Sequence, residues 1–304
     1  MAGHRLREDD RGMTTFVKLI VLLIVFGIVL GVYFGYFAFK TSTASPPRIV
    51  EMKDTVTISY IGSFEGGLVF DTSIKAVADD NATFPKALSF AWRTTYSDFT
   101  FTVGKTDCSS SETDCAILGM STAVLGLQQD NSNTATITPD NGYGEKDSSL
   151  VKVKSVNEQV PVREVMNVTA FQVRYNRVPV DGSIVKDPYW GWNSRVHMSG
   201  GLIVVENSPQ IAESYRLYEG KTKGGTWSVV VQSIDDGANN GTGEISLLDS
   251  FTFIGGKKLM VSAIAGDFFV TENDDGTYTV DHNKEVVGVN MVFRITVLRI
   301  TKSS

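Results

Sequence analysis

The sequence predicts an α+β protein that follows one apolar N-terminal helix. Short runs alternate apolar with polar residues between turns rich in Gly, Asn, Asp and Pro, which is typical of half-buried β-strands. Residues 116–127 instead carry apolar residues at helical spacing, and residues 19–39 contain no charge. We therefore expect one membrane helix, a mainly antiparallel β structure and one short helix within it.

The composition is that of a folded chain. Its 304 residues, 42% hydrophobic and 20% charged, leave room for one membrane segment and about two domains. The formal net charge is -6, and Lys and Arg are scattered rather than clustered, so the composition argues against a nucleic-acid-binding protein.

The N-terminal apolar run, residues 19–39, is long enough to cross a hydrocarbon core of about 30 Å as a helix. A cleaved signal peptide is the alternative, but its apolar region would be only about 7 to 15 residues long. The balance of flanking positive charges gives a modest bias toward a cytoplasmic N-terminus. We expect a single-pass cell-membrane protein whose C-terminal domains are extracytoplasmic. The flanking charges are Arg5, Arg7, Arg11 and Lys18 before the run, and Lys40, Arg48 and Lys53 after it.

Three glycines share one face of this helix. Gly27, Gly31 and Gly35 form two overlapping GxxxG spacings, which allow two helices to pack closely and make a dimer possible. Glycine is also common in membrane helices that do not dimerise.

Two features agree with an extracytoplasmic location. Cys108 and Cys115, with six residues between them, suit a small disulfide-closed loop in an oxidising compartment. Asn81, Asn167 and Asn240 begin N-x-[ST] sequons, although such tripeptides also occur by chance.

The folded part begins with a predicted hairpin over residues 54–73, after a linker over residues 40–52. Alternating residues up to Tyr60 form its first strand, Glu65-Gly66-Gly67 the turn, and the return strand ends at Phe70-Asp71. An Asp at this place is commonly a turn cap, and the aromatics are commonly core residues.

Three further elements follow the hairpin. Phe99 to Gly104 alternates as a strand, and Ala116 to Leu127 has room for about three helical turns. Thr134 to Thr138 is another strand, ended by a dense turn signal over residues 139–144. One face of the helix should pack on a sheet, and it carries Ile117, Met120, Val124 and Leu127.

These segments carry a family resemblance. DTVTISYIGSFEGGLVFDTS, FTFTVG, AILGM and TATITPDNGYG resemble, in order and spacing, the FKBP-type peptidyl-prolyl isomerases, and GVNMVFRITVLRI resembles the last strand of that fold. The resemblance covers residues 53–146 and 281–302. It implies an antiparallel sheet wrapped on a short helix, interrupted by an inserted domain over residues 147–280.

The position of the insertion resembles the SlyD-like branch, in which an insert-in-flap domain binds unfolded polypeptide. VDHNKEVVGVNMVF, with Asn283 and Gly288, resembles the return of that branch into its last strand. The insertion itself should form one or two small β units. Its expected strands are Ala170–Tyr175, Gly201–Glu206, Thr226–Gln232 and Phe268–Thr271.

An aromatic cluster in the insertion has two interpretations. Tyr189-Trp190-Gly191-Trp192 with Met198 is either an exposed patch for client chains or part of the core of a small β domain. Core packing is the favoured interpretation.

The resemblance implies a proline-binding pocket of aromatic and aliphatic residues with one polar member, Asp71, while Tyr143 would donate its hydroxyl to a substrate carbonyl. Such a pocket would isomerise X-Pro bonds without forming covalent bonds, by disfavouring the planar amide in a dry cavity. Ala116 replaces the usual larger aliphatic residue, and Met120 stands where many members have tryptophan. The remaining pocket positions are Tyr60, Phe70, Phe99, Ile117, Met120 and Phe293.

The sequence has few residues that could form a catalytic triad, a metal site or a phosphate-binding loop. Only His4, His197 and His282 are available for a triad or metal site, and Tyr215 stands where a phosphate loop ending at Thr222 needs glycine. We expect no cofactor or metal.

The expected partners are unfolded or proline-containing polypeptides and, through one helix, the membrane. Two alternatives remain, namely a holdase or adhesion module that has lost catalysis, and an assembly factor whose insertion binds one fixed membrane partner.

Overall fold

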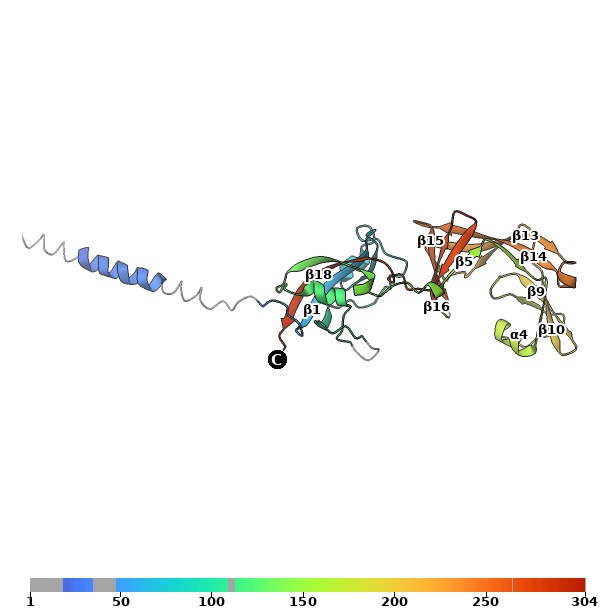
Figure 1. Ribbon diagram of the computed structural model, residues 1–304, viewed down its shortest axis with the longest axis horizontal. Coiled ribbons are helices and arrows are strands. Elements are labelled where there is room, and N and C mark those ends of the chain that lie inside the picture. Colours follow the sequence, from blue (N-terminus) through green and yellow to red (C-terminus); the bar gives the residue numbers. More distant parts are fainter. Residues whose placement is uncertain (1–18, 35–47, 109–112, 264, 304) are drawn as a thin grey trace, which may run out of the picture. The chain divides into compact units, whose positions relative to one another are not determined.

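The computed structural model describes residues 19–34, 48–108, 113–263 and 265–303 (Figure 1). The chain divides into two compact units between Arg48 and Ile49.

The described part of the first unit is a helix over residues 19–34. Its large apolar side chains, from Leu19 to Phe34, are exposed. Residues 35–39 of the expected membrane span, and Gly35 of the glycine face, lie outside the described residues. Among the described residues, no helix has both the length and the apolar character needed to cross a membrane.

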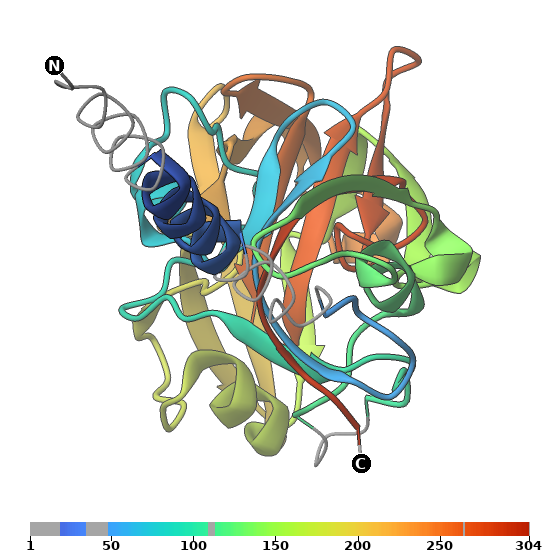
Figure 2. The same cartoon turned by 90° about the vertical axis from the view of Figure 1, so that its left-hand side faces the viewer.

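The second unit begins and ends in one antiparallel sheet with the order β2-β1-β18-β4, in which β3 also pairs with β1. The predicted hairpin and final strand are confirmed, and the first and last strands pair from Thr55↔Thr301 to Phe64↔Met291 (Figures 1 and 2). The strands are β1 (Thr55–Phe64), β2 (Val69–Thr72), β3 (Phe99–Thr102), β4 (Ser132–Ile137) and β18 (Met291–Thr301).

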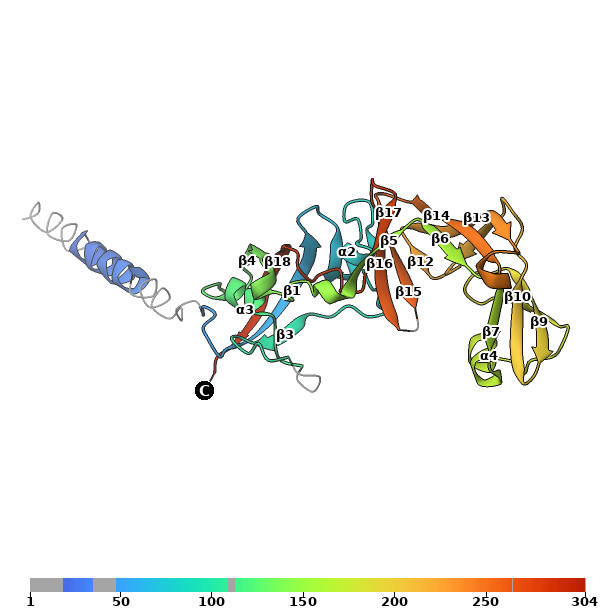
Figure 3. The ribbon, with the colours of Figure 1, turned by 45° about the vertical axis from the view of Figure 1, so that its right-hand side comes forward.

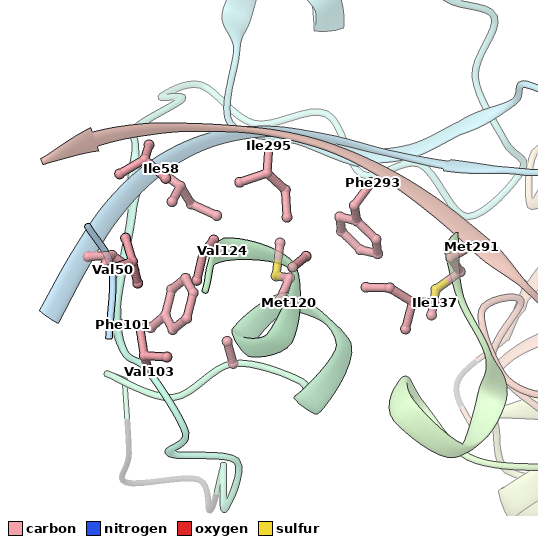
Figure 4. Close-up of a cluster of buried hydrophobic side chains, with 14 of the residues drawn as sticks. Val50, Ile58, Phe101, Val103, Met120, Val124, Ile137, Met291, Phe293 and Ile295 are labelled. Atoms are coloured by element: carbon pink, nitrogen blue, oxygen red, sulfur yellow. The ribbon is translucent and has the colours of Figure 1, made fainter. Parts of the chain in front are cut away.

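Helix α3 (Leu118–Val124) lies against this sheet (Figure 4). Met120 and Val124 are buried in the shared core, as the helical spacing predicted. A Cβ on Gly119 would lie 2.4 Å from Cγ2 of Ile137, so glycine permits the close approach of the helix to β4.

The helix is shorter than the three turns expected. Gly126 adopts a φ of +76° and donates its N–H to the carbonyl of Val50 at 2.9 Å, which diverts the backbone from helical bonding.

A second short helix, α2 (Lys75–Asp79), lies in the connection after β2, where no helix was expected. Five residues are too few to show a periodic pattern, and its buried Val77 and Ala78 anchor it by packing.

Between β4 and β18 the chain forms three further antiparallel sheets, with orders β7-β10-β9-β8, β11-β13-β14-β6 and β12-β15-β16-β17-β5. Their strands are β5 (Val151–Ser155), β6 (Asn157–Val160), β7 (Arg163–Met166), β8 (Ile184–Lys186), β9 (Asn193–Ser199), β10 (Leu202–Asn207), β11 (Ser214–Leu217), β12 (Thr222–Lys223), β13 (Gly225–Asp235), β14 (Glu244–Phe253), β15 (Lys258–Ala263), β16 (Gly266–Glu272) and β17 (Thr277–Asp281). The 3₁₀ turns are η1 (Pro139–Asn141), η2 (Ser148–Leu150) and η3 (Asn239–Gly241).

The β11-β13-β14-β6 sheet and the β12-β15-β16-β17-β5 sheet share one hydrophobic core. Trp190 and Trp192 belong to it, being 7% and 1% exposed and stacked with ring centroids 5.0 Å apart. The two tryptophans therefore belong to the core, as the favoured interpretation predicted. The alternative interpretation, in which they form part of an exposed patch, is wrong. Tyr189 and Met198 remain exposed.

Residues 170–175, expected as a strand, form most of helix α4 (Val168–Tyr175), which lies beside β9 and β10 (Figure 3). Asn167 caps the helix by accepting the N–H of Ala170 at 2.8 Å, and Asn176 ends it in the left-handed conformation. Phe171 is fully buried in the small core that α4 shares with its sheet. The strand prediction was wrong because a short apolar run cannot distinguish a strand from one buried helical face.

The chain enters and leaves these three sheets side by side. Gly288 donates its N–H to the carbonyl of Gly144 at 2.9 Å, and Lys146 pairs with Asp281 at 2.7 Å. β5 then pairs with β17 along its length. The return of the chain is thus held by backbone and charged contacts.

One carboxylate is buried in the large core of the insertion. Asp249 on β14 is 5% exposed, and its Oδ1 accepts the indole N–H of Trp227 at 2.6 Å. Its Oδ2 is buried and has no hydrogen-bond partner among the described residues. Burial raises the pKa of Asp249 to about 6, although the bond from Trp227 opposes this shift.

We expect this carboxylate to make stability fall with rising pH. Because the folded pKa of about 6 exceeds the unfolded value of 3.8, the folded state binds the proton more tightly. The resulting stability is present below the unfolded pKa and is lost as pH rises through the folded pKa, by about 3 kcal/mol in full. Urea unfolding followed by tryptophan fluorescence from pH 4 to 8 should show this slope, and Asp249→Asn should remove it. The exposed Asp235→Asn is the control, and parallel curves for all three proteins would contradict the prediction.

Candidate functional site

A cavity of about 660 Å³ opens beside α3, and the eight side chains selected from the sequence all line it. They come from β1, β2, β3, the start of α3, the turn after η1, and β18. The eight residues are Tyr60, Phe70, Asp71, Phe99, Ile117, Met120, Tyr143 and Phe293.

Aromatic rings make up one wall. The ring of Tyr60 lies 6.2 Å from those of both Phe99 and Phe293, and the ring of Phe70 lies 5.6 Å from that of Phe293 in an edge-to-face arrangement. Strand pairing causes this proximity, because Phe293 is opposite Gly62 and two residues along its strand from Ile295, the residue opposite Tyr60. Figure 4 shows Phe293 above α3 and close to Met120 and Ile137.

Gly62 makes room for this wall. A Cβ there would lie 2.8 Å from Cζ of Phe70 and 3.0 Å from Cε1 of Phe293. Glycine is therefore required at this position by the rings on either side, and it sets how closely they approach.

The polar member, Asp71, is the centre of a hydrogen-bond network. Its Oδ2 accepts the hydroxyl of Tyr60 at 2.6 Å, and its Oδ1 accepts from Nη2 of Arg93 at 2.6 Å and from the backbone N–H of Thr72 at 2.9 Å. Arg93 also donates to the carbonyl of Thr72. Both oxygens of the carboxylate are thus engaged, which fixes its orientation at the rim.

Asp71 also affects its neighbours electrostatically. Burial first, and the negative charge of Asp71 second, raise the pKa of Tyr60 well above its usual value, and the same causes raise the pKa of Tyr143. Partial burial by itself would lower the pKa of the Arg93 guanidinium, but the charge of Asp71 together with Tyr60 and Tyr96 raises this pKa above its usual value. At neutral pH both tyrosines are therefore hydroxyl donors.

The opposite wall is held by the start of α3 and a disulfide. Ile117 precedes the helix, and Met120 from its first turn is 6% exposed at the floor. Cys108 and Cys115 form the predicted disulfide, with Cα atoms 5.5 Å apart, and both line the cavity. The bridge ends directly before Ala116 and Ile117, so it constrains the segment that supplies this wall.

Tyr143 stands at the mouth and is 47% exposed. The turn of η1 positions it, because Gly142 and Gly144 both donate their N–H groups to the carbonyl of Pro139 at 2.9 Å. Within the described part of the chain, its hydroxyl makes no hydrogen bond, so it can donate to a ligand.

Several residues of the site were not selected from the sequence. Arg93 lies in a polar connection without any motif, so no sequence signal pointed to its contact with Asp71. The residues that line the cavity itself but were not selected are Thr106, Cys108, Cys115, Ala116, Leu118, Asp140, Asn141 and Gly142. The cavity as a whole is an apolar site with hydroxyl donors at its rim, which suits non-covalent binding of a small apolar ring.

The comparison with protein families agrees with this geometry. Residues 47–158 match the family model of the FKBP-type peptidyl-prolyl cis-trans isomerases, which is a little over a third of the chain. The comparison with curated proteins gave no match. The family match supports peptidyl-prolyl isomerase activity at the family level, and it includes every selected residue except Phe293.

We expect Gly62→Ala to destabilise the protein and distort the cavity. The added methyl would overlap the rings of Phe70 and Phe293, and overpacking of this kind costs about 1–3 kcal/mol. Urea unfolding measures the loss. Gly66→Ala is the matched control, since a Cβ there meets nothing within 4 Å. Equal stability of the two variants would contradict the proposed role of Gly62.

Proposed function

We propose that this protein is a membrane-anchored peptidyl-prolyl cis-trans isomerase and folding chaperone, acting on X-Pro bonds of exported or membrane proteins. The observation that carries the proposal is the convergence of the eight selected side chains on one cavity, with Asp71 held by Tyr60 and Arg93 at its rim. The family-level match supports the same activity.

The cavity provides what this reaction requires. Rotation about an X-Pro bond crosses a barrier of about 18–20 kcal/mol that arises from amide resonance, and no bond is formed or broken. The planar amide is more polar than the twisted one, so an aromatic cavity that excludes water favours the twisted state. The proline ring would sit among Tyr60, Phe99 and Phe293, on the floor formed by Met120.

The polar groups would hold the peptide on either side of that ring. The hydroxyl of Tyr143 would donate to a substrate carbonyl at the mouth of the cavity. The carboxylate of Asp71 would act at the twisted amide through its field, while Tyr60 and Arg93 keep it in position. Binding that strengthens only in the twisted state lowers the barrier.

Membrane anchoring is the second part of the proposal. Residues 19–39 carry no charge and are long enough to cross a bilayer, and the disulfide between Cys108 and Cys115 is consistent with an oxidising compartment. The N-terminus would be cytoplasmic, and dimers would pack through Gly27, Gly31 and Gly35.

The chaperone role is assigned to the insertion. Around and after α4, the apolar side chains of Val173, Val178 and Val180 are 81%, 69% and 60% exposed. Exposed apolar residues grouped on a small module offer contacts to unfolded polypeptide.

One observation favours a second candidate, a holdase or an assembly factor for a fixed membrane partner. Met120 and Ala116 provide a smaller and more flexible lining than the large side chains usual in the resembling family. A proline would then be bound but isomerised slowly.

We expect Asp71→Ala and Tyr143→Phe each to lower kcat/KM for a proline-containing tetrapeptide about tenfold, because each removes one polar contact with the twisted state. Exchange between the cis and trans forms, measured by NMR, gives the rates. Asp79→Ala on α2 and Tyr189→Phe in the insertion are the controls, since both side chains lie outside the cavity. Equal and negligible rates in every protein would refute the catalytic proposal and leave the binding alternative.

Removing residues 147–280 tests the chaperone role. Because Gly144 and Gly288 are hydrogen-bonded, a short glycine linker should rejoin Lys146 to Asp281 without disturbing the cavity. We expect the shortened protein to isomerise the tetrapeptide within about twofold of the parent rate and to accelerate refolding of a proline-limited protein about tenfold less. Unchanged catalysis of refolding would contradict the role of the insertion.

A further inference from the structure

A second cavity, of about 880 Å³, adjoins the first. Phe70 and Asp71, on edge strand β2, line both cavities, so the two cavities meet at these residues. The far side of the second cavity belongs to the insertion, where it is lined by Met260 on β15 and Phe269 on β16.

The floor of this second cavity is apolar and firmly packed. Met260 and Phe269 are 2% and 4% exposed, and Phe70 closes the floor toward the first cavity. The ammonium of Lys258 lies 4.2 Å from the centre of the Phe269 ring, a cation–π contact that holds the ring in place. Such a floor accepts an apolar side chain better than a polar one. The rest of the lining includes the charged or polar side chains of Asp267, His282 and Lys284.

A largely buried carboxylate links the two walls of the second cavity. Glu285, whose side chain is 9% exposed, accepts the backbone N–H of Ser89 at 2.9 Å through Oε2. Its Oε1 pairs with Lys258 of the insertion at 3.1 Å. Ser89 belongs to the connection between α2 and β3, and Lys258 begins β15. The Glu285 side chain therefore links the part of the chain before β4 to the insertion.

The Asp71–Arg93 pair forms the rim between the cavities. Asp71 lines both, while Arg93 lines the second and donates to Asp71 at 2.6 Å. A peptide backbone that passes this rim meets a carboxylate and a guanidinium, which match its N–H and C=O groups. The rim therefore suits an extended polypeptide that continues from one cavity into the next.

We propose that the second cavity is a subsite for an apolar side chain of the same polypeptide whose proline occupies the first cavity. This inference rests on the proposed function. A polypeptide is continuous, so a chain with its proline bound must leave the first cavity through an open side, and the neighbouring cavity offers an apolar floor there. The protein then selects substrates by an apolar residue near the proline as well as by the proline itself.

Two exposed alanines allow the subsite to be blocked without touching its floor or the first cavity. Ala91 and Ala265 line the second cavity from opposite walls and are exposed, so Ala91→Trp and Ala265→Trp should fill it. Ala76→Trp is the matched control, because Ala76 is exposed on α2 and lines neither cavity.

The probes are a fluorescent tetrapeptide with one proline and a twelve-residue peptide with the same central sequence, with Leu or Ser placed in turn at each flanking position. Fluorescence anisotropy measures binding, and NMR exchange measures isomerisation, with the full-length protein in detergent. At one or more positions on one side of the proline, the Leu peptide should bind about tenfold more tightly than the Ser peptide. Each blocking variant should remove this difference and change tetrapeptide binding less than twofold, and Ala76→Trp should preserve it.

The outcomes separate the two proposals. Equal binding of the Leu and Ser peptides at every position, or a blocking variant that weakens the tetrapeptide as much as the long peptide, overturns the subsite. A Leu preference that is lost on blocking, in a protein that isomerises neither peptide, supports the subsite and overturns the catalytic proposal instead.

Discussion

The pairing of the first strand with the last is the constraint on which the rest of the structure depends. β1 and β18 are joined from Thr55↔Thr301 to Phe64↔Met291, so residues far apart in the sequence become neighbours. This register sets Phe293 opposite Gly62 and beside Tyr60, which creates the aromatic wall. Because β4 and β18 are also neighbours in this sheet, the segment between them must leave the sheet and return to it at the same end.

That return explains how a large insertion coexists with a small binding site. The entering and leaving segments are hydrogen-bonded to each other through Gly144 and Gly288. The insertion can therefore join the sheet that carries the cavity without changing the pairing of its strands. A largely buried charge at the junction, that of Glu285, contacts both sides. Asp71 has a similar role at smaller scale, because its two oxygens join β1, β2 and the connection that carries Arg93.

Much of the fold and of the candidate site followed from local patterns. Period-2 alternation and the glycine turn predicted β1 and β2, and helical spacing predicted that Met120 and Val124 face the core. Such patterns failed where the local signal was ambiguous. The run at residues 170–175 was expected as a strand and forms α4, since its helical state depends on the cap from Asn167 and on burial of Phe171 in a core built by distant strands.

The sequence by itself determined the chemical character of the protein: an uncharged N-terminal run, two cysteines able to pair, and aromatic residues with one Asp in the order of a proline-binding family. Only the tertiary structure decided which of these residues meet. Arg93 reaches Asp71 from a connection without periodicity, and Phe70 and Asp71 separate two cavities, one of which is lined partly by the insertion. Contacts between segments so far apart depend on strand register and long-range packing, and no local pattern of residues encodes them.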